Sequence, residues 1–170
     1  MPLEIDSEKA SLKSFEDHYR YDASYLHEVL ETSPGGYEAF SKFGEMGMYR
    51  RVLSPDIFFV SKIATAQTED CGPCTELNVR MAQEAGVQDD VIRGALKGEG
   101  LRYELEQVRL FSIAVAFNEV KPGQVEEMKD IVGQEGLAEL ALCIASMRVY
   151  PCMKRALGFD QSCAVALPLV

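Results

Sequence analysis

Residues 54–74 read SPDIFFVSKIATAQTEDCGPC, and they join an apolar helical stretch to two closely spaced cysteines. Ser54 and Pro55 are typical of a helix start, because serine caps the first turn and proline fits the first helical position. From Ile57 to Ala66 the side chains are apolar on most sides of the helix. This pattern predicts a deeply buried helix that ends just before the cysteine pair.

Cys71 and Cys74 are separated by two residues, and Pro73 between them is placed to open a second helix. Two thiols within one turn can form a short disulfide and reopen it. The positive end of a helix also stabilises a thiolate and brings its pKa toward neutrality. A redox role therefore fits this pair best.

Two other interpretations of the pair stay open. Both cysteines could be small buried apolar residues, although this leaves the proline in the loop unexplained. A zinc site would need four ligands, but Cys143, Cys152 and Cys163 are spaced 9 and 11 residues apart, and the chain has only two histidines, His18 and His27. We expect these three cysteines to pack in the structure, and we expect no metal or other cofactor.

The motif Cys-Gly-Pro-Cys also occurs in thioredoxins, where it lies between a central β-strand and a helix. Reading outward from the motif gives helices almost throughout and no alternating strand pattern, which excludes that fold. Stop signals at Gly86, Gly98 and Pro122-Gly123 separate the later helices. Asp89 or Asp90 should cap the helix after Gly86, and Pro151 should kink the last helix or end it near Tyr150. The prediction is one all-α domain over residues 1–170, with an N-terminal helical extension over about 1–50.

Composition and net charge limit the classes of partner that this protein can bind. Of the 170 residues, 47% are hydrophobic, enough for a sizeable core, and the formal charge of −10 disfavours nucleic acid and anionic membranes. No apolar run approaches the roughly 20 residues of a spanning helix, and the first residues lack the pattern of a signal peptide. We expect a cytoplasmic protein with small-molecule or protein partners and no membrane partner.

The stretch from Ser54 to Asn118 contains a buried helix, a cysteine pair, a turn stopped by glycine and a further apolar helix. This order, together with the segment GVQDDVI that begins at Gly86, resembles the carboxymuconolactone decarboxylase-like superfamily, whose alkylhydroperoxidase-D branch carries a redox cysteine pair. The segment MKRALG, ending at Gly158, is similar to the closing helices of larger peroxidase-related members. The resemblance covers about two thirds of the chain.

The resemblance implies an all-α bundle of the alkylhydroperoxidase-D-like type that assembles into trimer-based homo-oligomers. It also implies that Cys74 attacks the peroxide and that Cys71 resolves the disulfide, in a pocket between helices. Family members that reduce hydroperoxides carry a histidine and a glutamate at the positions of Asn78 and Phe59. The proton relay of the family is therefore missing from this chain.

Other side chains near the motif are candidates for the missing relay. Asn78 lies on the same helical face as the cysteines and can hydrogen-bond near them, although an amide cannot take a proton. Glu69 and Asp70 directly precede Cys71, and Asp56 lies about one turn from Phe59. Negative charge beside a thiol raises the pKa of that thiol, so these acids should oppose the effect of the helix end.

These observations predict a thiol–disulfide oxidoreductase with weak peroxidase activity. Its partners would be a small hydroperoxide or a protein disulfide, together with a dithiol reductant. The alternatives are a non-redox member of the family that binds a small molecule in the pocket, and a decarboxylase or lactone-type activity.

Two structural expectations follow from this prediction. Cys71 and Cys74 should have Cα atoms no more than about 7 Å apart, and Cys71 should be the more exposed of the two, because it precedes the helix. Segments 57–66 and 110–117 are apolar nearly all round, which predicts that the chain forms a homo-oligomer to cover them.

Overall fold

The computed structural model describes residues 4–159, and every regular element in this range is an α-helix. The all-α class is therefore confirmed. The helices, in chain order, are α1 (Ile5–Tyr19), α2 (Ser24–Thr32), α3 (Pro34–Gly47), α4 (Pro55–Thr68), α5 (Gly72–Glu84), α6 (Asp89–Lys97), α7 (Tyr103–Ala116) and α8 (Gln124–Ala156).

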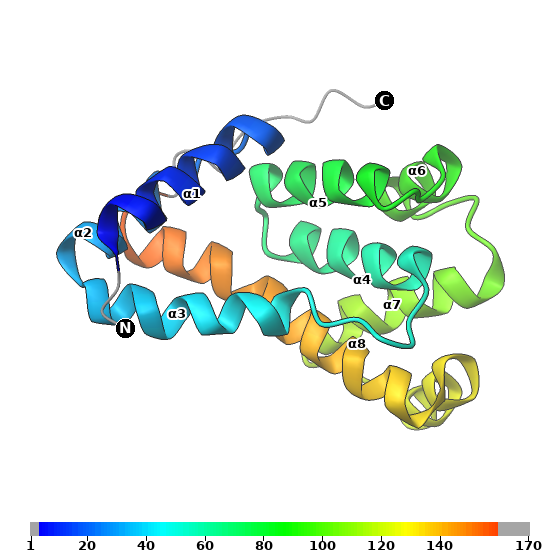
Figure 1. Ribbon diagram of the computed structural model, residues 1–170. Helices are drawn as coiled ribbons and strands as arrows, with labels where there is room; N and C mark the ends of the chain where they lie inside the picture. The colour runs from blue at the N-terminus through cyan, green and yellow to red at the C-terminus, as the bar shows by residue number, and fades with distance from the viewer. Residues whose placement is uncertain (1–3, 160–170) are drawn as a thin grey trace.

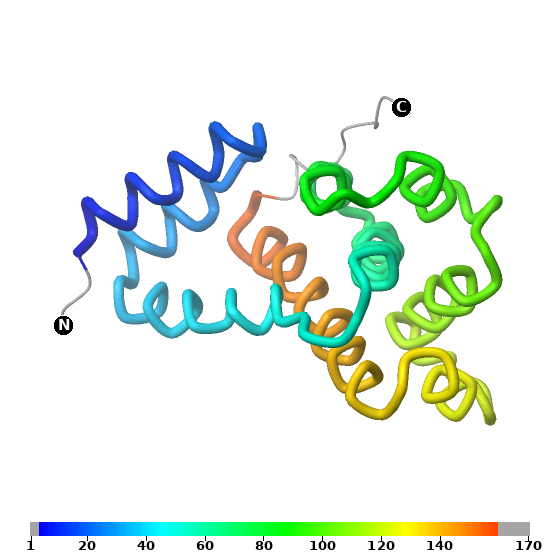
Figure 2. The backbone as a smooth tube through the Cα atoms, turned by 45° about the vertical axis from the view of Figure 1, so that its right-hand side comes forward, coloured from blue at the N-terminus to red at the C-terminus, as the bar shows by residue number. Residues whose placement is uncertain are grey.

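The helices form two groups that α8 connects (Figure 1). Helices α1, α2 and α3 lie at one end of the molecule, and α4 to α7 lie at the other, as the second view also shows (Figure 2). The N-terminal group has an apolar cluster of its own, which includes Leu12, Tyr25 and Leu30. The predicted N-terminal extension is thus a packed layer against the rest of the fold.

Helix α4 is the centre of the larger group. Its residues Phe58–Ala66 are all buried, and they pack against α5, α7 and α8 of the same chain. The apolar surface of α4 is therefore covered without a second copy of the chain, so this helix gives no reason to expect an oligomer. Leu110 and Phe117 remain exposed at α7, and the homo-oligomer stays a prediction.

Most predicted helix boundaries agree with the structure, with two exceptions. The side chain of Ser54 accepts a hydrogen bond from the backbone N–H of Ile57, as expected for a cap. Gln88, not Asp89 or Asp90, stands at the cap position of α6. The helix containing Pro151 does not end near Tyr150 but continues to Ala156, and the non-helical residue of α8 is Gly133, with φ of 75°.

A buried carboxylate joins α8 to the loop before α4. Glu139 is 1% exposed, and its two oxygens accept hydrogen bonds from the backbone N–H groups of Arg51, Val52 and Leu53 at 2.8–3.2 Å. These bonds hold the pKa of Glu139 below its ordinary value, although burial acts in the opposite direction. The loop therefore has a fixed attachment where it enters α4.

Helix α8 is the one described helix that is long and apolar enough to cross a membrane, judged by length and composition alone. Leu140, Cys143, Ile144 and Met147 of this helix are buried inside the protein. The core helix of a soluble protein meets the same criterion, so this is weak evidence for a membrane span. The absence of a membrane partner and the cytoplasmic location stay predictions.

Candidate functional site

The cysteine pair lies where α4 ends and α5 begins. Cys71 occupies the position before the first turn of α5, and Cys74 lies within that turn. The two residues form a disulfide with a Cα–Cα separation of 5.3 Å, which confirms that they lie within disulfide reach. Pro73 is at the start of the helix, as the motif predicted.

Both cysteines are buried, and the expectation that Cys71 is the more exposed is wrong. Cys71 is 1% exposed and Cys74 is 2% exposed. The reason is tertiary packing, because Ala66 from α4 and Met147 from α8 form a small cluster with the pair. A position before a helix is exposed only where no other element covers it.

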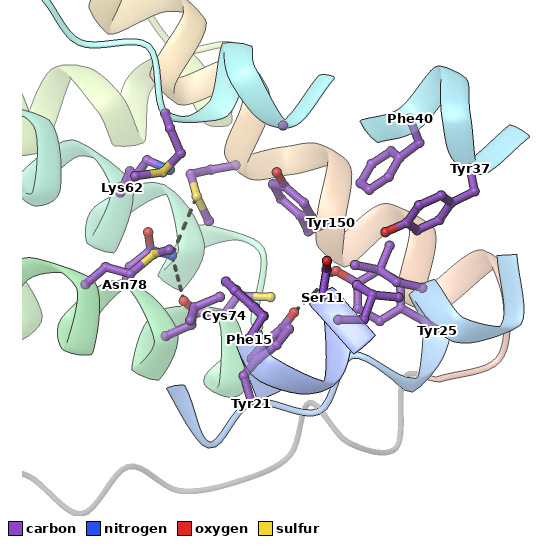
Figure 3. A pocket seen from close by; sticks show the side chains of 17 residues that line it. Ser11, Phe15, Tyr21, Tyr25, Tyr37, Phe40, Lys62, Cys74, Asn78 and Tyr150 are labelled. Carbon is purple, nitrogen blue, oxygen red and sulfur yellow. Dashed lines mark hydrogen bonds between the residues drawn. The ribbon is translucent and has the colours of Figure 1, made fainter. Parts of the chain in front are cut away.

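Cys74 lines a cavity of about 320 Å³, within the size range of small-molecule sites (Figure 3). More than half of the residues around this cavity come from the first fifty residues of the chain. Examples from α1, α2 and α3 are Leu12, Phe15, Tyr25, Leu26, Tyr37 and Phe40. The N-terminal extension therefore forms the wall that faces the cysteine.

Asn78 lines the same cavity, as its position on the face of Cys74 predicted. Its Nδ2 donates a hydrogen bond to the backbone oxygen of Cys74 at 2.7 Å and contacts the sulfur of Met147 at 3.6 Å. The first bond fixes the orientation of the amide, since the reversed amide would place two oxygens against each other. Asn78 Oδ1 is buried and has no hydrogen-bond partner in the structure.

Lys62 is a cavity residue that the sequence reasoning missed. Its side chain is 3% exposed, its Nζ lies 3.7 Å from the sulfur of Met48, and it lies 5.1 Å from the centre of the Phe58 ring. Burial lowers the pKa of this amine. A lysine between Phe58–Val60 and Ile63 interrupts an apolar run, and this interruption was the available signal in the sequence.

The acids proposed as relay groups do not line the cavity. The carboxylate of Glu69 binds Arg148 and Arg155, each at 2.8 Å. Burial would raise the pKa of Glu69, but these two arginines lower it overall. Glu69 is therefore held as a neutralised ion pair, which also removes the reason to expect that its charge raises the pKa of the thiols.

Asp56 pairs with Arg102 at 3.8 Å near the start of α4, away from the cavity. Phe59, at the family glutamate position, packs in the main core and does not line the cavity either. Tertiary structure thus separates both positions from Cys74.

The two histidines, Cys143 and Cys152 also lie outside the cavity. His18 is 3.2 Å from Glu84, and His27 is 3.5 Å from Glu16. Cys143 is buried as predicted, whereas Cys152 is exposed; Cys163 lies outside the described residues. Within residues 4–159, no three His, Cys, Asp or Glu side chains gather in a way that could hold a metal ion.

Replacement of Lys62 by methionine should stabilise the protein by about 1–3 kcal/mol at neutral pH, because it removes a buried amine that pairs with no carboxylate within residues 4–159. The folded-state pKa of Lys62 is lowered, so the cost of burying this amine falls as the pH rises toward the ordinary lysine pKa. The stability that Lys62→Met gains over the natural protein should therefore decrease as the pH rises toward the ordinary lysine pKa.

Denaturant unfolding at neutral pH and near the ordinary lysine pKa measures this gain. Lys97→Met, at the exposed end of α6, is the matched control and should change little. A loss of stability in Lys62→Met would show that the amine makes a favourable interaction in the folded protein.

Comparison of the chain with protein-family models, with curated proteins and with solved structures finds no match in any of the three. The site is therefore interpreted from its own geometry.

Proposed function

We propose that this protein is a thiol–disulfide oxidoreductase in which Cys74 is the reacting thiol and Cys71 is the resolving thiol. The supporting observation is that Cys74 is paired with Cys71 and also lines an apolar cavity large enough for a small molecule. Cys71 does not line that cavity. A small oxidant in the cavity can therefore approach only one of the two sulfurs.

The reaction with a hydroperoxide has three steps, which together return the protein to its dithiol form. The Cys74 thiolate attacks one oxygen of the O–O bond, the bond breaks, and a proton goes to the departing oxygen, which gives a sulfenic acid and an alcohol. The Cys71 thiol then attacks the sulfenic sulfur and releases water, which leaves the disulfide. An external dithiol reduces this disulfide and returns both thiols.

Burial of the pair favours a small organic hydroperoxide over a protein disulfide as the oxidant. Both sulfurs are covered, and thiol–disulfide exchange requires direct access to a sulfur atom. A small molecule can reach Cys74 through the cavity, whereas a folded protein would need the helices to separate. A small dithiol is the reductant that fits the same route.

The missing relay supports weak peroxidase activity. Asn78 cannot transfer a proton, and neither Glu69 nor Asp56 lies at the cavity. Proton transfer by a positioned group is typically worth 10²–10⁴-fold in rate. The resemblance of residues 54–118 further supports an alkylhydroperoxidase-D-like bundle and a trimer-based homo-oligomer as parts of this proposal, and a cytoplasmic location completes it.

Mild peroxide treatment of the reduced protein should convert Cys71 and Cys74 into a disulfide without loss of helical structure, and dithiol treatment should reverse it. Peptide mass spectrometry and circular dichroism measure both. Cys152 is the internal control, because it is exposed but has no cysteine partner in the described chain. Random pairing among the cysteines, or unfolding on oxidation, would contradict the proposal.

A second candidate is a non-redox protein that binds a small molecule in the same cavity. The observation in its favour is that the cavity contains two buried polar groups, Lys62 Nζ and Asn78 Oδ1, that are poorly satisfied within the chain. A stable disulfide that resists reduction by dithiols in the folded protein would favour this candidate. A decarboxylase or lactone-type activity has less support, since no acid or histidine among the described residues lines the cavity.

A further inference from the structure

The cavity contains a buried amine without a counter-ion. Lys62 makes no salt bridge with any carboxylate in residues 4–159. Its Nζ contacts the sulfur of Met48 at 3.7 Å and interacts electrostatically with the buried thiol of Cys143. A buried cation is costly unless an opposite charge or good hydrogen-bond acceptors accompany it. Lys62 is therefore a stability cost in the empty protein that a bound anion would offset.

The other cavity walls suit a hydrocarbon. Most lining residues are apolar or aromatic, and α1, α2 and α3 supply the largest share of them. In Figure 3, Lys62, Asn78 and Cys74 lie toward one end of the cavity, and Tyr25, Tyr37 and Phe40 lie toward the other. The cavity thus has a buried amine and an amide at one end and mainly aromatic rings at the other, where tyrosines also carry hydroxyl groups.

We propose that the cavity binds a single-chain aliphatic carboxylate, with the carboxylate at Lys62 and the hydrocarbon chain against the aromatic wall of α1–α3. Burial of each further methylene group strengthens binding, so a chain of several carbons gives appreciable affinity. A neutral apolar ligand would leave the amine uncompensated. A ligand amine would place two cations together.

Asn78 adds a second recognition element at the same end of the cavity. Its buried Oδ1 is an acceptor without a partner in the structure, so it favours a ligand group that carries an O–H. A hydroperoxide and the alcohol formed from it both carry such a group. The idea that a bound hydroperoxide also reacts with Cys74 rests on the proposed function. Binding of the carboxylate at Lys62 does not depend on it.

Isothermal titration of the full-length disulfide form with decanoate, decanol and decylamine tests the proposal. We expect decanoate to bind at least about tenfold more tightly than decanol, and decylamine to bind most weakly. Lys62→Met should abolish the preference for the acid while decanol still binds. Lys97→Met, which replaces an exposed lysine, should behave as the natural protein.

Equal affinity for decanoate and decanol, absence of binding by all three, or an acid preference that survives in Lys62→Met would overturn the proposal. If Lys62→Met does not fold, the pH dependence of the natural protein decides. The acid preference should fall as the amine loses its proton, since decanoate stays ionised and decanol is uncharged; a constant preference would overturn the proposal. Because these titrations need no thiol chemistry, they fail or succeed independently of peroxide-driven disulfide formation.

Discussion

We expect Cys74→Ser to reduce peroxide consumption to the uncatalysed background, because Cys74 is the sulfur that faces the cavity. A serine hydroxyl is a weak nucleophile and does not replace a thiolate in attack on the O–O bond. The loss should be complete even with excess dithiol. Peroxide disappearance in the presence of dithiol, compared with the same mixture without protein, measures it.

Cys71→Ser should leave the first reaction with peroxide intact, and this difference from Cys74→Ser shows which cysteine attacks and which resolves. With the resolving thiol removed, Cys74 should still react once with peroxide and should accumulate as a sulfenic acid, which a dimedone-type reagent traps. Cys152→Ser is the matched control, because this exposed cysteine lies outside the cavity. Trapping of the sulfenic acid at Cys71 in the Cys74→Ser variant would reverse the assignment.

The largest expected loss of stability is that of Glu139→Ala. The substitution removes the acceptor of three backbone N–H groups and should lower the free energy of unfolding by about 2–4 kcal/mol. For a chain of this size the corresponding fall in Tm is roughly 4–16 °C. Denaturant and thermal unfolding followed by circular dichroism measure both.

The effect of Glu139→Ala should depend on pH. The folded-state pKa of Glu139 is lowered, so its stabilising contribution is fully present above the ordinary glutamate pKa and is lost as the pH falls through the folded value. The difference in unfolding free energy between the natural protein and Glu139→Ala should therefore decrease as the pH falls below the ordinary glutamate pKa. Glu135→Ala, at an exposed position of the same helix, should cost little at any pH.

If the difference in unfolding free energy between the natural protein and Glu139→Ala stays constant down to strongly acidic pH, this account of Glu139 is wrong. It would mean that the packing of the side chain, and not the charge that its carboxylate presents to the loop, carries the stability. Glu139→Gln separates the two contributions, because it keeps the volume and one acceptor oxygen but places an N–H₂ group against backbone donors.

The sequence was sufficient to predict the helices and the reach of the cysteine pair. Apolar periodicity over Ile57–Ala66, the Ser54 cap and the glycine stops are local signals, and they predicted α4, α5 and their boundaries closely. Disulfide reach between Cys71 and Cys74 follows from a separation of three residues at a helix start. Helix ends and the distance between nearby cysteines depend on residues that are close in the chain. The sequence alone is therefore enough to predict them.

The burial of the pair and the composition of the cavity could not be predicted in this way. Met147 covers the cysteines from 73 residues beyond Cys74 in the chain. The cavity residues from Ser11 to Met48 belong to the N-terminal extension, for which the sequence predicts no role in the site. Lys62 was part of an apolar stretch in the sequence, yet in the fold it is the buried cation of the cavity.

The sequence by itself determined an all-α chain with a cysteine pair at the start of a helix, since helix periodicity and motif spacing are short-range properties. Tertiary structure alone decided which of the nearby polar residues face Cys74. Glu69 was the obvious neighbour in sequence, but Arg148 and Arg155 of α8 hold it away from the cavity. The physical reason is that charge pairing and cavity shape depend on side chains that long-range packing brings together.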